Sequence, residues 1–272
     1  ADAGAQTSPT LLYAWFRLSG QSRQMRAGSY EIAPGTSPQR LLSMLVRGEE
    51  SLRTVTVVEG WNWRQVRQAL AKAENLRPDS RALSDEALMA QLGRPGVAPE
   101  GRFYPDTYSY AKGTSDLAVL QRAMKAMDKQ LQQAWEARQP GAALQSPEQA
   151  LILASIVEKE TGKAQDRAQI SGVFNNRLRI GMRLQTDPTV IYGLGEAFDG
   201  NLRRVHLTTD TPWNTYTRAG LPPTPIAMPG KASLLAAVQP AKTSAIYFVA
   251  KGDGSSHSSA TLDEHNRAVN RS

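Results

Sequence analysis

One stretch, residues 146–162, constrains this chain more than any other, because it has the features of a helix with both ends marked. Ser146 is a favourable N-cap, Pro147 suits the first helical position, and Gln149 completes a capping box. Gly162 supplies a signal for the C-terminal end. Most residues between these ends are apolar, so we expect a helix that is largely buried.

The two glutamates near the end of this helix are expected to have different surroundings. At about 100° per residue, Glu160 falls on the face that should meet the core, together with Leu153, Ile156 and Val157. Glu158 points roughly the other way. Burial raises the pKa of a carboxyl, and a raised pKa is what general-acid chemistry near neutral pH requires.

Glu160 also has a structural interpretation. Its carboxylate is expected to pair with an arginine such as Arg177 or Arg183 if the side chain is part of the core, and such ion-pair networks also perturb pKa values. The helix taken alone favours this structural role. A case for catalysis therefore depends on the rest of the chain.

Composition narrows the possible functions. The length of 272 residues suggests one large or two modest domains, and 40% hydrophobic with 21% charged residues is typical of a folded protein. The net charge of +7 favours an anionic partner, but the charge is spread along the chain, which argues against nucleic acid. Without cysteine or an HExxH motif, and with only three histidines, we expect no metal and no cofactor. No apolar run reaches the ~18 residues of a membrane span.

The hydrophobic pattern predicts an α+β fold. A strand at 28–32, a helix at 39–46 and a strand at 53–58 outline a small module. Further helices are expected at 61–73, 116–139, 166–180 and 231–238, and a buried strand at 245–250. From Gly181 onward, glycine and proline predict loops and short strands. A domain boundary is placed near residue 98.

Two polar segments offer groups that suit a carbohydrate. Residues 183–189 and 213–217 combine amides, hydroxyls, a carboxylate and aromatic rings, which hydrogen-bond sugar hydroxyls and N-acetyl groups or stack on pyranose rings. Taken singly, each segment is explained by turns and caps. Taken jointly with Glu160, a carbohydrate site is the better account. No nucleophile elbow or dinucleotide loop competes with it.

A family resemblance enters at these residues. The blocks 152–161, 176–192, 214–216, 220–223 and 247–250 resemble, in order, the endolytic murein transglycosylases of the YceG-like family, over roughly residues 27–266. The resemblance implies that the second acid of the Glu-Lys-Glu triplet, Glu160, is catalytic. It also implies a LysM-like module near residues 30–58. An N-terminal inner-membrane anchor, absent from this chain, would hold the catalytic part in the periplasm.

These expectations combine into one prediction of organisation. Residues 1–98 contain a small LysM-like module, and residues 99–272 form a larger mixed helix/strand catalytic domain. The chain cleaves the MurNAc–GlcNAc bond of nascent peptidoglycan strands and leaves 1,6-anhydro-MurNAc ends. Glu160 acts as acid and then as base, with substrate bound by Gln185, Thr186, Asp187, Tyr192, Asn214, Thr215 and Tyr216. Peptidoglycan synthases are possible partners, and nucleic acid is not.

Two alternatives stay open. One is a hydrolytic muramidase, in which Glu160 works with Asp187 or Glu158, because ordinary glycosidases pair two carboxylates about 5 to 9.5 Å apart. The other is a peptidoglycan-binding scaffold without turnover. A scaffold has no need of an acid on an apolar helical face, whereas a transglycosylase does.

Overall fold

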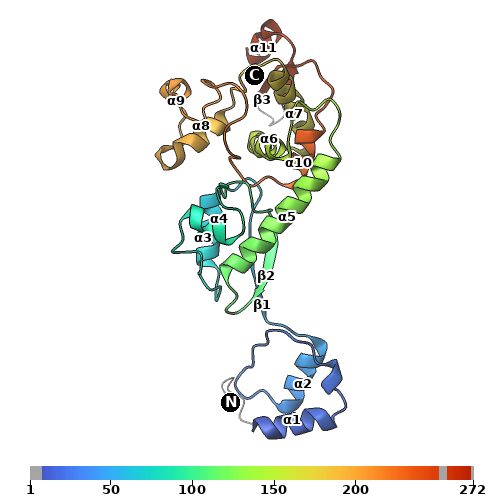
Figure 1. The fold of residues 1–272 in the computed structure, drawn as a ribbon. Helices are drawn as coiled ribbons and strands as arrows, with labels where there is room; N and C mark the ends of the chain where they lie inside the picture. Colours follow the sequence, from blue (N-terminus) through green and yellow to red (C-terminus); the bar gives the residue numbers. More distant parts are fainter. Residues whose placement is uncertain (1–7, 251–255, 271–272) are drawn as a thin grey trace.

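Helix α6 (Pro147–Glu160) lies inside the larger end of the molecule, in contact with helices on several sides (Figure 1). The computed structural model describes residues 8–250 and 256–270 of the chain. The described residues form mostly helices together with two small antiparallel strand pairs, which confirms the predicted α+β class. The other described elements, in chain order, are α1 (Pro9–Leu18), η1 (Ser22–Gln24), α2 (Pro38–Arg47), β1 (Leu52–Thr56), α3 (Trp63–Lys72), α4 (Asp85–Gln91), β2 (Thr107–Ala111), α5 (Asp116–Glu136), α7 (Ala164–Arg179), α8 (Asp187–Leu194), η2 (Gly195–Ala197), α9 (Arg204–Thr208), α10 (Lys231–Val238), β3 (Tyr247–Ala250), β4 (Ser256–Ser259) and α11 (Leu262–Val269).

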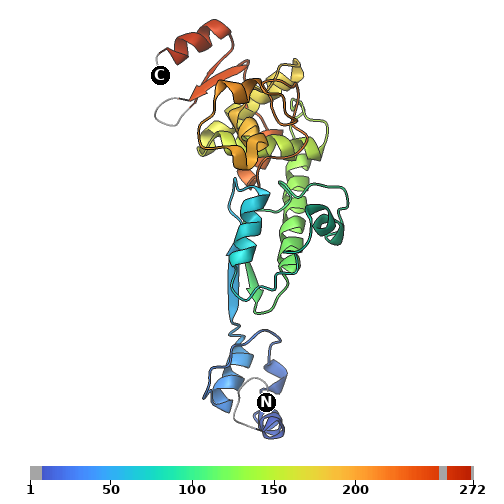
Figure 2. The same ribbon diagram turned by 90° about the vertical axis from the view of Figure 1, so that its left-hand side faces the viewer.

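Three hydrophobic cores follow one another along an elongated molecule (Figures 1 and 2). A small core joins α1 and α2 at the N-terminal end. A second core packs α3, α4 and the first half of α5 against the β1–β2 pair. The largest surrounds α6 and includes the second half of α5, with α7 and α10. Helix α5 therefore ties the second and third cores together.

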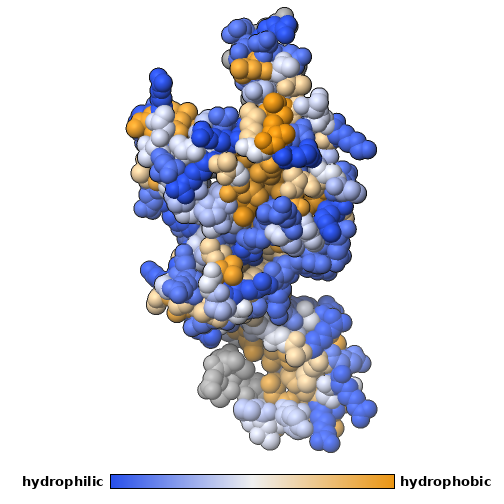
Figure 3. All heavy atoms as spheres, turned by 45° about the horizontal axis from the view of Figure 1, so that its top comes forward, coloured by the Kyte–Doolittle hydropathy of each residue, from blue (hydrophilic) through white to orange (hydrophobic). Residues whose placement is uncertain are grey.

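The β1–β2 pair connects parts of the chain that are distant in sequence. The two strands are antiparallel, with Val55 opposite Tyr108. Both side chains are buried in the second core, whose residues come from both sides of residue 98. A second antiparallel pair, β3–β4, lies beside α7 and α11. On the face that Figure 3 shows, hydrophobic side chains reach the surface only in limited patches.

The N-cap Ser146 and the early proline of α6 are confirmed, but the predicted capping box is not formed, because the side-chain oxygen of Gln149 accepts from the backbone N–H of Gln145 and not from that of Ser146. The hydroxyl of Ser146 accepts a hydrogen bond from the backbone N–H of Gln149 at 3.3 Å, and Pro147 occupies the first turn. The helix ends at Glu160, two residues before the expected stop at Gly162. Every residue from Ala150 to Val157 is buried. The helix is therefore enclosed on all sides and has no single core-facing stripe.

Two other expectations are wrong. Residues 28–32 form no strand, so the predicted strand–helix–strand outline of the N-terminal module is incomplete: α2 is present, but β1 pairs with β2 instead. The region after Gly181 was expected to consist of loops and short strands, yet it contains the helices α8 and α9. The helices predicted at 39–46, 61–73 and 166–180 are confirmed as α2, α3 and α7.

Candidate active site

The carboxyl group of Glu160 lies where α6 ends. Its Oε1 atom accepts a hydrogen bond from the hydroxyl of Thr186. Burial raises the pKa of Glu160 to about 6. The Thr186 hydrogen bond opposes this rise in pKa, the charge of Asp187 adds to it, and the positive charge of Arg177 opposes it. At mildly acidic to neutral pH, a substantial fraction of molecules holds the protonated acid, as general-acid catalysis requires.

The predicted ion pair with an arginine is not formed. No cation of the described residues lies within salt-bridge distance of the Glu160 carboxylate. The buried guanidinium of Arg177 instead donates to the backbone carbonyls of Leu184, at 2.5 Å, and Ile246, at 2.7 Å. The exposed Arg183 likewise donates to a backbone carbonyl. Glu160 is therefore enclosed without a partner that would fix it in the charged state.

A cluster of threonine hydroxyls holds the segment that contacts Glu160. The hydroxyl of Thr215 accepts from the backbone N–H of Thr186 at 3.1 Å and lies 2.8 Å from the hydroxyl of Thr189. The backbone carbonyl of Thr215 accepts from the N–H of Gln185 at 3.1 Å. All three threonines are buried. Thr215 therefore positions Thr186, which in turn orients the acid.

Asp187 and Tyr216 form a pair beside the acid. The hydroxyl of Tyr216 donates to Oδ1 of Asp187 at 2.5 Å. Burial raises the pKa of Tyr216, and the hydrogen bond to Asp187 and the charges of Asp187 and Glu160 raise it further. The phenol of Tyr216 therefore stays protonated and donates a hydrogen bond to one oxygen of Asp187. Asp187 itself is exposed, which leaves it accessible to a substrate.

Gln185 and Asn214, both predicted to bind substrate, lie in opposite environments. Gln185 is exposed, makes no side-chain hydrogen bond to the described residues, and adopts a positive φ of 49°. Asn214 is fully buried. Its amide donates to three backbone carbonyls, those of His206, Leu207 and Thr209, and its oxygen accepts from the N–H of Tyr216 at 2.9 Å. Gln185 is available to a ligand, whereas the hydrogen bonds of Asn214 stabilise the loop that contains it.

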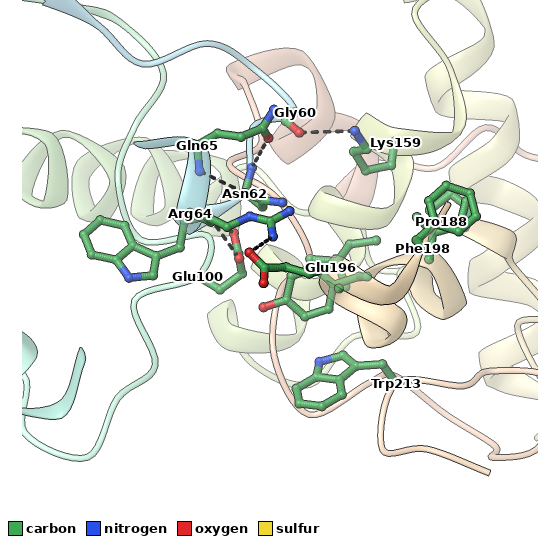
Figure 4. Close-up of a pocket in the computed structure, with 15 residues that line it drawn as sticks. Gly60, Asn62, Arg64, Gln65, Glu100, Lys159, Pro188, Glu196, Phe198 and Trp213 are labelled. Carbon is green, nitrogen blue, oxygen red and sulfur yellow. Dashed lines mark hydrogen bonds and ion pairs between the residues drawn. The ribbon is translucent and has the colours of Figure 1, made fainter. Parts of the chain in front are cut away.

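Tyr192 lies in a cavity next to these groups. The cavity has a volume of about 740 Å³ and separates the α3 region from α8 and η2 (Figure 4). Tyr192 and Trp213 meet there edge to face, with ring centroids 5.6 Å apart. Glu160 does not line this cavity, but its neighbour Lys159 does, as does Pro188, the neighbour of Asp187. Tyr192 therefore lies near residues that adjoin Glu160 in the sequence or at the site, but it does not contact Glu160 itself.

Glu158 is buried, which the helical-face argument did not predict. Its side chain is 6% exposed, and its carboxylate lies 3.5 Å from Arg167, itself 11% exposed. The other oxygen accepts from the backbone N–H of Gly230, at the start of α10, at 2.9 Å. The expectation that Glu158 points away from the core is wrong because α10 packs on that side of α6. The charge of Glu158 is compensated, unlike that of Glu160.

Glu100 is a further buried acid that the sequence did not single out. It is 5% exposed, and both its oxygens accept from the backbone N–H of Trp63, at 3.0 and 3.1 Å. Burial raises the pKa of Glu100 to about 7, although the hydrogen bonds from Trp63 and Tyr192 oppose the rise. Glu100 follows a proline in a loop, and loops lack the hydrophobic periodicity from which burial of a residue is predicted.

Neither a metal cluster nor a membrane span is found in the described part of the chain. No group of three or more histidine, aspartate or glutamate side chains is placed to hold a metal ion. No described helix combines the length and the apolar character needed to cross a membrane.

Comparison with known proteins places the chain in a family. A model of the YceG-like family matches residues 1–271. A Bacillus subtilis protein named endolytic murein transglycosylase is 32% identical over 260 residues, which cover 89% of this chain and 72% of the relative. A Streptococcus pneumoniae protein of the same name is 26% identical, and the chain spans 53% of its length. The crystal structure of a YceG-like protein from Listeria monocytogenes, 28% identical, superposes with a TM-score of 0.64 over 96% of this chain and 91% of that one. The chain therefore belongs to the YceG-like family.

Proposed function

We propose that this protein is an endolytic murein transglycosylase, which cleaves the MurNAc–GlcNAc bond inside nascent glycan strands, and that Glu160 is its catalytic acid. The observation that carries the assignment of Glu160 is its environment. It is an enclosed carboxyl, with a pKa raised to about 6, whose hydrogen-bond partner is the neutral hydroxyl of Thr186. Such a group both donates and accepts a proton near neutral pH.

In the proposed reaction, protonated Glu160 donates its proton to the oxygen that links MurNAc to GlcNAc. The bond from that oxygen to the anomeric carbon breaks, and GlcNAc leaves with a free hydroxyl. The Glu160 carboxylate then takes the proton from the carbon-6 hydroxyl of MurNAc. The carbon-6 oxygen bonds to the anomeric carbon and closes the 1,6-anhydro ring. No water is consumed, and Glu160 ends protonated as it began.

The other predicted site residues receive separate roles in this proposal. Thr186 orients the acid, and Thr215 and Asn214 position the backbone around it without touching substrate, because both are buried. The exposed side chains of Gln185 and Asp187 contact the sugar, and Tyr216 holds Asp187. Charged Asp187 also favours the oxocarbenium-like transition state by its negative charge.

The hydrolytic alternative needs a second carboxylate near Glu160, and of the two predicted candidates only Asp187 stays accessible to a substrate. Glu158 is paired with Arg167, and Asp187 accepts the hydroxyl of Tyr216. Digestion of glycan strands in water enriched in the heavy oxygen isotope, followed by mass spectrometry, separates the two reactions. We expect unlabelled products that are lighter by one water. Label at the new muramic acid end would establish hydrolysis, and no cleavage at all would leave only a binding scaffold.

We propose the predicted division at residue 98 as a division of function. The groups around Glu160 lie in residues 99–272, and residues 1–98 hold the LysM-like region, for which α2 and the family resemblance are the support. The strand pair and core that cross residue 98 tie the two parts mechanically. A chain that lacks residues 1–50 keeps both larger cores. We expect it to retain cleavage of soluble glycan and to bind intact sacculi more weakly.

The family resemblance also supports a cellular setting. We propose that the chain works in the periplasm, held at the inner membrane by an N-terminal anchor, near peptidoglycan synthases. Fractionation of cells and cross-linking of the protein in its native context test this. Recovery in the cytoplasm would contradict it.

A further inference from the structure

The cavity beside the acid has two walls of different chemistry. One wall belongs to α8 and the residues around it and is largely apolar, with half-buried side chains of Pro188, Ile191, Tyr192, Phe198 and Trp213. The opposite wall comes from the start of α3 and contributes Asn62, Arg64 and Gln65 (Figure 4). Lys159 of α6 lies at one edge. An aromatic face opposite hydrogen-bond donors is the usual arrangement for binding a sugar ring with polar substituents.

The amides of Asn62 and Gln65 are held in a defined orientation. Their oxygens are used within α3, where Asn62 Oδ1 accepts from the N–H of Gln65 and Gln65 Oε1 accepts from the N–H of Asn62, both at 3.0 Å. This capping box leaves both NH₂ groups without a partner among the described residues. The wall therefore offers fixed donors, which suit a ligand rich in carbonyl and ether oxygens.

The cavity lies next to the segments that contain Glu160 and Asp187. Lys159 directly precedes Glu160, and Pro188 directly follows Asp187, whose charge acts on Glu160. The segments that carry Glu160 and Asp187 therefore also border the cavity. Its volume of about 740 Å³ lies within the range of ~300–1,000 Å³ that is usual for binding sites of small ligands. The ion pair of Arg64 and Glu196 across it is exposed, so it is readily displaced.

We infer that this cavity is a subsite for an N-acetylhexosamine unit of the strand, next to the unit that reacts. This inference rests on the proposed function. The pyranose ring packs on the wall formed by Tyr192, Phe198 and Trp213. Its acetamido carbonyl and ring oxygens accept hydrogen bonds from the amides of Asn62 and Gln65. The subsite anchors the strand, so that an internal bond reaches Glu160.

The capping box allows a test that preserves the fold. Asn62→Asp and Gln65→Glu keep the oxygens that cap α3, and acidic residues are equally good at these positions. Each change replaces the NH₂ donor with a carboxylate oxygen and adds one negative charge, so the control must add the same charge away from the cavity. A matched control is Gln149→Glu, the same substitution at the third residue of α6, whose oxygen accepts from a backbone N–H and which does not line the cavity.

The probe is the uncharged N-acetylglucosamine hexamer, and binding is measured by calorimetry in a Glu160→Gln background, which prevents turnover. Loss of one neutral hydrogen bond weakens binding by about fivefold. We therefore expect Gln65→Glu to raise Kd about fivefold, the double variant to raise it more than tenfold, and Gln149→Glu to leave it unchanged. Phe198→Ala, outside the three cores, should weaken binding through the apolar wall.

Activity assays separate this inference from the proposed function. With Glu160 intact, the double variant should raise KM on peptide-free strands and leave kcat nearly unchanged, because the groups around Glu160 are untouched. Equal Kd values for the double variant and the control would overturn the subsite while leaving the transglycosylase activity in place. Weakening confined to strands that carry stem peptides would overturn the sugar assignment in favour of the peptide. Failure of the unmodified enzyme to form anhydro ends would instead reject the proposed function.

Discussion

The last turn of α6 contains two glutamates, two residues apart, whose surroundings differ. Glu158 faces α7 and α10, where the guanidinium of Arg167 and the N–H of Gly230 meet its two oxygens. Glu160 faces the segment before α8, where, among the described residues, the hydroxyl of Thr186 is its one side-chain hydrogen-bond partner. Both carboxyls are enclosed by the same fold, but within the described part of the chain only Glu158 has a cation within salt-bridge distance.

This difference shows what distinguishes a structural acid from a candidate catalyst. Enclosure alone makes the charged form costly. A cation and a backbone donor offset that cost at Glu158. At Glu160 the Thr186 hydrogen bond and the charge of Arg177 offset the cost only in part, and burial still raises the pKa to about 6. Substitutions at the two positions should therefore affect different properties of the protein.

The largest expected effect is on the rate of cleavage. Glu160→Gln keeps the shape of the side chain but cannot donate a proton, so turnover of glycan strands should fall by at least about 100-fold. Its unfolding transition should stay close to that of the parent. Glu158→Gln, assayed at equal concentration of folded protein, should retain most of the activity. If Glu158→Gln were the inactive variant instead, the assignment of the acid would be wrong.

The next effect is on stability. Glu158→Gln leaves the buried guanidinium of Arg167 without a counter-charge, which costs about 3 to 5 kcal/mol for a buried pair. Urea denaturation should show this loss, and Glu160→Gln should show none. The double variant Glu158→Gln/Arg167→Gln should recover part of the loss, because it removes both charges. A change below about 1 kcal/mol would mean that the pair is effectively solvated.

Glu100 provides a third buried carboxyl for comparison. Its pKa is raised from 4.5 to about 7, so the folded state binds the proton more tightly than the unfolded state. The corresponding stability is complete below about pH 4.5 and is lost as pH rises through about 7. At about 1.4 kcal/mol per pKa unit, the loss is on the order of 3 kcal/mol. Melting curves of Glu100→Gln between pH 4.5 and 8 should show a smaller decline than those of the parent. An equal decline would contradict burial of this carboxyl.

The smallest expected effect is a shift in the pH profile. Because the acid form of Glu160 is required, kcat/KM should fall on the alkaline side with an apparent pKa near 6. Asp187→Asn removes a negative charge that raises this pKa, so the fall should begin at lower pH, by less than about one unit. Thr186→Val removes a hydrogen bond that lowers the pKa of Glu160 and should move the fall to higher pH. Movement of both profiles in the same direction would contradict these roles.

Much of the fold follows from local signals. The caps of α6 at Ser146 and Pro147 appear where the sequence predicts them, and α2, expected at residues 39–46, begins after an N-cap at Ser37 and ends with a C-cap at Gly48. Helix α8 was missed because Asp187-Pro188 suits a turn as well as the first turn of a helix. A helix of eight residues is too short to persist without tertiary packing. The local sequence therefore does not distinguish a turn from a helix at Asp187-Pro188.

The sequence by itself determined where α6 begins and, to within two residues, where it ends, and it identified Glu160 as an enclosed acid. Only the tertiary structure decided that Glu158 is equally enclosed but paired. Helical periodicity assumes one buried face, whereas α6 has neighbours on all sides. The strand expected at 28–32 also failed to form, while β1 paired with β2, which begins 55 residues later in the chain. Local patterns fix elements and caps, but the partners of a buried charge or of a strand edge come from residues far away along the chain.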